Sequence, residues 1–189
     1  MQWSKTKAIL EGFLCEKLKK RIQLHATVYR IQDSPGRVWI TFDKKEILSA
    51  SDLTFAVKHG RLYEQMKAEA NLSGIPYNQN WEVMFQSKER QALVGASDHA
   101  EEILMRQSIF ESYHLYAPLM NYSHLSIEEA LKSENSIIRA FSMFDKRLGK
   151  RTLKKLYFTE GTHPLVMKFY NIRCAVEGVQ NVFLSWAKG

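Results

Sequence analysis

The spacing of apolar residues along the chain changes near residue 20. Between Trp3 and Lys20, apolar side chains share one side of a helical wheel, which predicts an amphipathic helix. From residue 22 onward, β-branched and aromatic residues dominate, and polar turns at Asp33–Gly36 and Asp43–Lys45 interrupt them. Strands are therefore predicted over residues 22–31, 37–42 and 46–50. We expect the first helix to pack on an antiparallel meander.

Beyond Ser51, which is placed to cap a helix, the strand pattern disappears and the spacing becomes helical. Residues 72–80 contain Gly74, Pro76 and two asparagines, and they are the best predicted loop. Further helices are predicted over residues 53–70, 81–94, from Asp98 to before Pro118, 127–132 with Ser126 as the cap, 135–145, and from Pro164 to a stop at Gly178.

These elements predict an α+β protein: an N-terminal helix with a small three-stranded antiparallel sheet, followed by a mostly helical C-terminal part. The length of 189 residues fits a single domain over residues 1–189. An internal boundary, if the chain has one, is expected in loop 72–80. It would separate a helix plus β-meander (1–71) from a helical part (81–189).

Charge is unevenly distributed along the chain. Residues 1–60 hold 11 basic and 6 acidic residues, residues 61–135 hold 6 and 11, and residues 136–189 hold 10 and 3. Two interpretations stay open: an exposed basic surface that attracts a polyanion, or basic and acidic segments that neutralise each other in the fold.

The segment Asp145–Lys155 places six cations in the ten residues after Asp145. As a helix, it would carry the cations on one half of the wheel and leucines on the other. Gly149 permits a different interpretation, in which one helix ends at Leu148 and Lys150 opens the next, so that the cations form a corner. The residues expected to bind an anionic partner, with nucleic acid as the first hypothesis, are Arg147, Lys150, Arg151, Lys154 and Lys155.

Two hypotheses from other classes stay open. One is a protein-interaction or immunity-like module that docks an acidic protein through its basic end and forms a homodimer through Val182–Trp186. The other is a metal-dependent nuclease-like hydrolase, with a site around Glu11, Asp43 and Lys45 and with Asp33 nearby in sequence. Asp33 and Asp43 both sit in polar turn sequences, so the turn interpretation is preferred.

Several classes of site lack a sequence signature. No Gly-x-Gly, Gly-x-Ser-x-Gly or His-x-x-x-His pattern occurs, so no cofactor and no metal is predicted, and a non-catalytic protein is favoured over an enzyme. Cys15 and Cys174 are expected to be buried reduced thiols. His163, beside Pro164, is expected at a helix boundary, with a general base near Glu160 as the alternative. Because no signal peptide or membrane span is apparent, we expect a cytoplasmic protein without membrane contact.

Several segments together resemble a known family. They are Trp3–Lys7, Ser133–Arg151 with Ile138-Arg139-Ala140-Phe141 and Asp145-Lys146-Arg147, and His163–Cys174 with Phe169-Tyr170 and Arg173-Cys174. They resemble an uncharacterised family of small soluble bacterial proteins with no assigned function. The resemblance extends over nearly the whole chain. It implies a bacterial cytoplasmic setting, and it implies no activity, cofactor or site residue.

Overall fold

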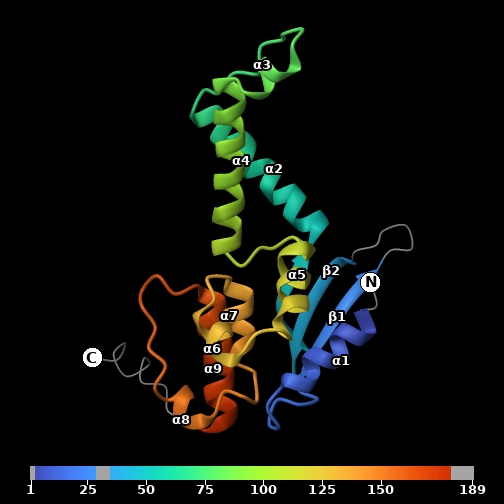
Figure 1. The fold of residues 1–189 in the computed structure, drawn as a ribbon, viewed down its shortest axis with the longest axis vertical. Coiled ribbons are helices and arrows are strands. Elements are labelled where there is room, and N and C mark those ends of the chain that lie inside the picture. Colours follow the sequence, from blue (N-terminus) through green and yellow to red (C-terminus); the bar gives the residue numbers. More distant parts are fainter. Residues whose placement is uncertain (1–2, 29–34, 180–189) are drawn as a thin grey trace.

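The computed structural model describes residues 3–28 and 35–179. It has two parts, which Figure 1 shows one above the other. The lower part, called the body here, comprises the sheet, the N-terminal helix and the helices that follow residue 111. The upper part, called the arm, comprises residues 52–106 and projects away from the body.

The sheet is a meander, as the alternation of apolar residues predicted. Its strands are β1 (Ile22–Val28), β2 (Pro35–Phe42) and β3 (Lys45–Ser51), all antiparallel and in that spatial order. Leu24 pairs with Ile40, and Ile40 pairs with Leu48, so three buried side chains lie side by side on one face. Asp43 and Lys44 both have positive φ values, of 48° and 66°, which suits the tight turn between β2 and β3. The predicted turn residues Asp33 and Ser34 lie outside the described residues.

The first helix, α1 (Trp3–Phe13), is shorter than the predicted span to Lys20. The chain leaves the helix because the next residues pair with a distant segment. Leu14 forms an antiparallel bridge with Asp145, and the backbone N–H of Cys15 donates to the carbonyl of Phe144 at 2.9 Å. This contact joins the segment that follows α1 to the segment 143–145 in the second half of the chain.

Two helices of the body are capped by the residues that the sequence indicated. Ser126 caps α6 in a capping box with Glu129, and Gly178 ends α9 in the left-handed conformation, with φ of 67°. The body helices are α5 (Ser112–Tyr122), α6 (Ile127–Lys132), α7 (Ser136–Ser142), α8 (Lys150–Leu153) and α9 (Pro164–Glu177). The predicted single helix from Asp98 to before Pro118 is wrong, because the chain leaves the helix after Arg106 and Pro118 lies inside the next helix, Ser112–Tyr122.

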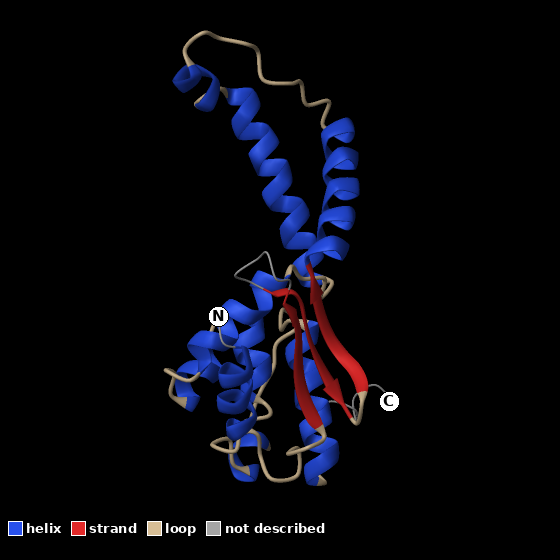
Figure 2. Ribbon diagram, turned by 90° about the vertical axis from the view of Figure 1, so that its right-hand side faces the viewer, coloured by secondary structure: helices blue, strands red, loops and turns tan. Residues whose placement is uncertain are grey.

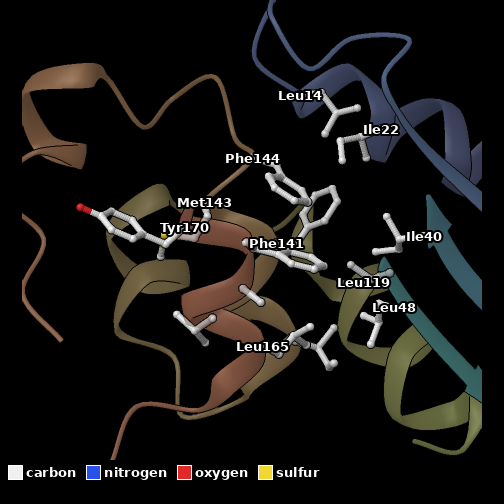
Figure 3. Packing of buried hydrophobic residues seen from close by; sticks show 14 of the residues in the cluster. Leu14, Ile22, Ile40, Leu48, Leu119, Phe141, Met143, Phe144, Leu165 and Tyr170 are labelled. Carbon is white, nitrogen blue, oxygen red and sulfur yellow. The ribbon is translucent and has the colours of Figure 1, made fainter. Parts of the chain in front are cut away.

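The core of the body lies between the sheet and the pair α7 and α9, with α5 against the sheet (Figure 3). Aromatic rings fill its centre. Phe144 stacks on Phe169 with ring centroids 4.4 Å apart, and Tyr122 meets Phe141 edge to face at 4.8 Å. The core continues to the sheet, where Leu119 of α5 lies near Ile40 and Leu48 of the strands (Figure 3).

The arm is a helical hairpin that extends beyond the end of the sheet (Figure 2). Its long helices, α2 (Asp52–Glu69) and α4 (Lys88–Arg106), pack along each other, and the short α3 (Trp81–Phe85) lies at the far end. Loop 72–80 is a loop as predicted. Because it joins α2 to α3 at the far end, the residues before and after it meet in one hairpin.

One predicted helix start is wrong. The helix expected from Asp98 begins ten residues earlier, at Lys88, where the Ser87 hydroxyl accepts a hydrogen bond from the Arg90 N–H at 3.2 Å. Asp98 lies within the helix and is exposed. Among the described residues, no helix combines the length and the hydrophobicity that crossing a membrane requires.

Candidate functional site

The basic segment Asp145–Lys155 forms a corner, and the interpretation as one continuous helix is wrong. Only Lys150–Leu153 is helical, and Gly149 is its N-terminal cap residue. No helix runs through Asp145, because its carboxylate bonds to the backbone two residues further on, as in a turn. One carboxylate oxygen of Asp145 accepts a hydrogen bond from the N–H of Arg147 at 2.8 Å.

Asp145 is the buried centre of this corner, with 0% of its surface exposed. A buried carboxylate is strongly destabilising unless it is paired and hydrogen-bonded. Here the Tyr122 hydroxyl donates to Oδ2 at 2.6 Å, and Nη2 of Arg147 donates to the same oxygen at 2.7 Å. Burial, and then the bond to Asp145, raise the pKa of Tyr122 far above its usual range, so the phenol keeps its proton.

Arg147 is held by the fold. Besides Asp145, its guanidinium donates from Nη1 to the carbonyl of Leu125 at 2.8 Å, and it lies over the ring of Phe13 at 4.4 Å from the centroid. The hydrogen bonds to Asp145 raise the pKa of Arg147. The side chain therefore connects the corner, the α5–α6 connection and α1.

Arg173 and Glu177 of α9 hold the corner from the opposite side. Arg173 is 3% exposed, and it donates to the carbonyls of Met143 and Asp145, both at 3.0 Å, and of Leu148 at 2.9 Å. Glu177 pairs with Arg173 at 3.3 Å and with Lys150 at 3.2 Å. Burial would raise the pKa of Glu177, but the hydrogen bond from Lys150 and the nearby cations outweigh it and lower the pKa.

The five predicted anion-binding residues thus fall into two groups. Arg147 and Lys150 take part in ion pairs with Asp145 and Glu177. Arg151, Lys154 and Lys155 are exposed, and none of the three has an ion-pair partner in the part of the chain that the structure describes. Arg147 and Lys150 are exposed as well, but fewer cations of the corner lack a charge partner than the sequence suggested.

A different surface stands out at the far end of the arm. Four large apolar or aromatic side chains are mostly exposed there: Tyr77 (86%), Trp81 (68%), Val83 (52%) and Phe85 (52%). We call these four residues the tip cluster. Asn80 caps α3 by accepting the Glu82 N–H at 2.9 Å, so the short helix holds Trp81 and Phe85 one turn apart, with ring centroids at 5.9 Å.

The arm behind the tip cluster has few buried side chains. In α2 and α4 they are Phe55, Ala100 and Leu104, and all three lie in the half of their helix that is nearer to the body. Phe55 contacts the rings of His59 and His114, with centroids 5.6 Å and 5.4 Å away. The outer half of the hairpin therefore has no fully buried side chain within the described residues.

The tip cluster was not predicted from the sequence. Its signal was present: α3 has only five residues, four of them large and apolar, and it lies between the polar stretch 78–80 and Gln86-Ser87. A helix this short cannot bury apolar side chains on several sides by itself. The span 81–94 was predicted as one helix, which hid the break at Gln86 and Ser87.

The residues of the hydrolase alternative have structural partners. Glu11 accepts the backbone N–H of Leu24 at 3.2 Å, and Asp43 accepts from Nε of Arg21 at 2.8 Å. The hydrogen bond from Arg21 lowers the pKa of Asp43. No group of three or more His, Cys, Asp or Glu residues placed to hold a metal occurs in residues 3–28 and 35–179, and Asp33 lies outside this range.

His163 is a helix boundary, as expected. Its Nδ1 accepts from the N–H of Leu165 at 3.1 Å, and its Nε2 lies 2.8 Å from the carbonyl of Met105. Both ring nitrogens are therefore used in structural hydrogen bonds. Cys15 and Cys174 are buried free thiols, as predicted, and burial raises the pKa of both.

Comparison with known proteins gives a family. No curated protein and no solved structure matches the chain. A family match covers residues 2–174, nearly the whole chain, and it agrees with the resemblance to an uncharacterised family that the sequence segments showed. The chain therefore belongs to the SF0329 protein family.

Proposed function

We propose that this protein is an interaction module that docks another protein with the tip of its arm. The observation that carries the proposal is the tip cluster, in which four large side chains stand exposed at the end of a projecting hairpin. As the sequence resemblance implies, the proposed setting is the bacterial cytoplasm.

Exposed aromatic residues are the first support. Burying apolar surface contributes about 25 cal/mol per Å², and Trp and Tyr are enriched among the residues that dominate binding energy at protein interfaces. Trp81 and Phe85 are fixed relative to each other by α3, so little side-chain freedom is lost when they dock. A rigid pair of rings on an extended arm is suited to entering an apolar groove.

The charge of the tip supports a protein partner over a nucleic acid. Residues 71–90 contain two acidic side chains, Glu82 and Glu89, and two basic ones, Lys88 and Arg90. Binding to a phosphate backbone depends on an excess of cations, and this segment has none. Balanced charges around an apolar centre are instead the arrangement of a protein interface, with a polar rim around a dry core.

The test is a site-specific photocrosslinker, p-benzoylphenylalanine, placed at Val83 in cells that contain the natural partners. We expect one dominant protein adduct, identified by mass spectrometry, that disappears when Trp81→Ser and Phe85→Ser are added. Lys58, exposed in the first half of α2, is the matched control position.

The outcomes separate the possible occupants. An adduct with a different protein at Val83 but not at Lys58 supports the proposal. An adduct with a second copy of this chain would show self-association through the tip. It would not test the homodimer predicted from the sequence, whose expected seam, Val182–Trp186, lies outside the described residues. Equal adducts at the two positions, or adducts that survive the double substitution, would contradict docking through the tip.

A second candidate function is binding of an anionic partner, nucleic acid or acidic protein, at the corner. The exposure of Arg151, Lys154 and Lys155 favours it. Three phosphate contacts give a log–log salt slope of about −3 for duplex DNA, measured by fluorescence anisotropy. Replacing all three by Ala should abolish such binding, whereas no binding at about 50 mM salt would exclude this candidate.

A further inference from the structure

A large cleft lies at the junction of the arm and the body, away from the tip cluster. Its volume is about 1030 Å³, and its walls are the last turn of α4, one face of α5, the start of α7, and the segment that leads into α9. Sites for small organic molecules commonly measure about 300 to 1,000 Å³. This cleft is therefore large enough for such a molecule.

Arg139 of α7 lines this cleft, and its charge is not compensated by the fold. Nε of Arg139 is buried without a hydrogen-bond partner, and its guanidinium has no ion pair within residues 3–28 and 35–179. Nε of Arg173, two helices further along the chain, also lacks a hydrogen bond, but it lies 3.3 Å from the Glu177 carboxylate, and the Nη atoms of Arg173 donate to three carbonyls. Arg139 has neither kind of partner among the described residues.

Arg139 is half-buried, and its Nε is the atom that has lost contact with water without gaining an acceptor, which is unfavourable for the folded protein. Such a group calls for a specific explanation, and a bound anion is the most direct one. Arginine also suits this role chemically. Its planar fork matches the two oxygens of a carboxylate or phosphate, and it keeps its charge at every physiological pH.

The rest of the lining defines the other parts of the ligand. Arg106, exposed at the end of α4, brings a second cation from the arm side of the cleft. Met105, Tyr113 and Ile138 provide apolar and aromatic wall. Pockets with apolar walls and a few convergent charged groups bind small organic molecules in a defined orientation.

We infer that this cleft is a binding site for a small organic anion, whose carboxylate or phosphate group is held by Arg139 and Arg106 while an apolar or ring-shaped body lies against Tyr113 and Ile138. Glu102, Glu134 and Glu160 also line the cleft. They would repel a ligand with several negative charges and would accept hydrogen bonds from donors on the ligand. The site is therefore selective for molecules with one anionic group.

The test uses benzoate and phenyl phosphate as probes, since each joins one anionic group to a ring. Benzyl alcohol, which has the ring without the charge, is the control ligand. Binding is measured by protein-detected NMR titration and by the shift in melting temperature. We expect saturable binding of one or both anions with a dissociation constant of about 1 mM or tighter. Which anion binds more tightly distinguishes a carboxylate site from a phosphate site.

Substitutions link the binding to the cleft. Arg139→Gln should weaken the anion at least tenfold, and Arg106→Gln, at an exposed position, should weaken it by a smaller factor. Arg61→Gln removes an exposed cation of α2 that lies outside the cleft and the corner, and it should leave the affinity unchanged. Without ligand, R139Q should melt at the same temperature as the natural protein or higher, because it removes the uncompensated charge.

Two results would overturn the inference. One is that neither benzoate nor phenyl phosphate shows saturable binding up to about 10 mM, so that both behave like benzyl alcohol. The other is binding whose affinity is the same in R139Q and R106Q as in the control R61Q, which would assign the anions to another surface. Because R106Q alters an exposed side chain, it decides the question even if R139Q fails to fold.

Discussion

The body and the arm are built on opposite principles. The body closes around buried charges: Asp145 is fully buried, and Arg173 binds the carbonyls of the same corner. The arm, with helices of 18 and 19 residues, fully buries only Phe55, Ala100 and Leu104 in those helices. Other large apolar side chains of the arm are exposed: the tip cluster at its far end, and Leu53, Val57 and Val94 along the two helices.

This difference shows which part of the protein has a core of its own. In the body the buried charges of the corner, Asp145, Arg173 and Glu177, have partners within the fold. In the arm, a hairpin with little core is only marginally stable, and the tip cluster offers apolar surface that a partner would cover. The buried charges of the body and the exposed apolar side chains of the tip cluster therefore both support the same interpretation, in which the body is the scaffold and the arm is the docking element.

The largest expected effect is on the body. Asp145→Asn removes the negative charge that accepts hydrogen bonds from Arg147 and Tyr122. It should lower the free energy of unfolding by about 3 to 5 kcal/mol. Chemical denaturation measures this. Asp98→Asn, at an exposed position in α4, is the control and should change stability by no more than about 0.5 kcal/mol. A loss below about 1 kcal/mol in D145N would mean that the buried network is not what holds the corner.

The next effect should be confined to the arm. Phe55→Ala removes a buried ring at the base of the hairpin, a change that typically removes about 3 to 5 kcal/mol. Amide hydrogen exchange should show the loss in α2 and α4, with α7 and α9 unchanged. If the protection of α7 fell as much as that of α4, the two parts would unfold as one unit and the contrast between them would be wrong.

A smaller effect depends on pH. Glu177→Gln should lower stability by about 1 to 2 kcal/mol at neutral pH, because it removes the carboxylate that Arg173 and Lys150 share. The folded protein lowers the pKa of Glu177, so its contribution exists above the ordinary value of 4.5 and disappears as the pH falls through the lowered folded-state pKa. The difference between E177Q and the natural protein should therefore shrink in acid; a difference that grew in acid would contradict this assignment.

The smallest effect on stability is expected at the tip. Because Trp81 and Phe85 are mostly exposed, Trp81→Ser with Phe85→Ser should change the free energy of unfolding by no more than about 0.5 kcal/mol. The same pair should nevertheless abolish the crosslink from Val83. A loss of several kcal/mol in thermal denaturation would instead assign these rings to the folding of the arm.

Much of the fold follows from local signals in the chain. The alternation in β1 to β3, the caps at Ser51 and Ser126, and the Pro164 and Gly178 boundaries of α9 all predicted elements correctly, since each depends on residues close in sequence. The predicted α+β class followed from these elements.

What the sequence did not reveal depends on distant contacts. Lys150 pairs with Glu177, which is 27 positions further along, and Arg147 also reaches the carbonyl of Leu125, 22 positions back. No local pattern indicates that these cations are engaged. The projection of the arm could not be predicted either. Helical spacing indicates which face of α2 is apolar, but it does not indicate that α4 is the element that packs along this helix.

The contrast between the two parts is that the body has a core of its own, while the outer half of the arm has none within the described residues. Amide hydrogen exchange of the isolated protein, resolved by residue, tests this most directly. The account predicts that the outer halves of α2 and α4 exchange at least about 100-fold faster than α7 and α9, a difference of about 3 kcal/mol in opening free energy. Equal protection of the arm and the body would contradict the claim, since the hairpin would then be stable without a partner.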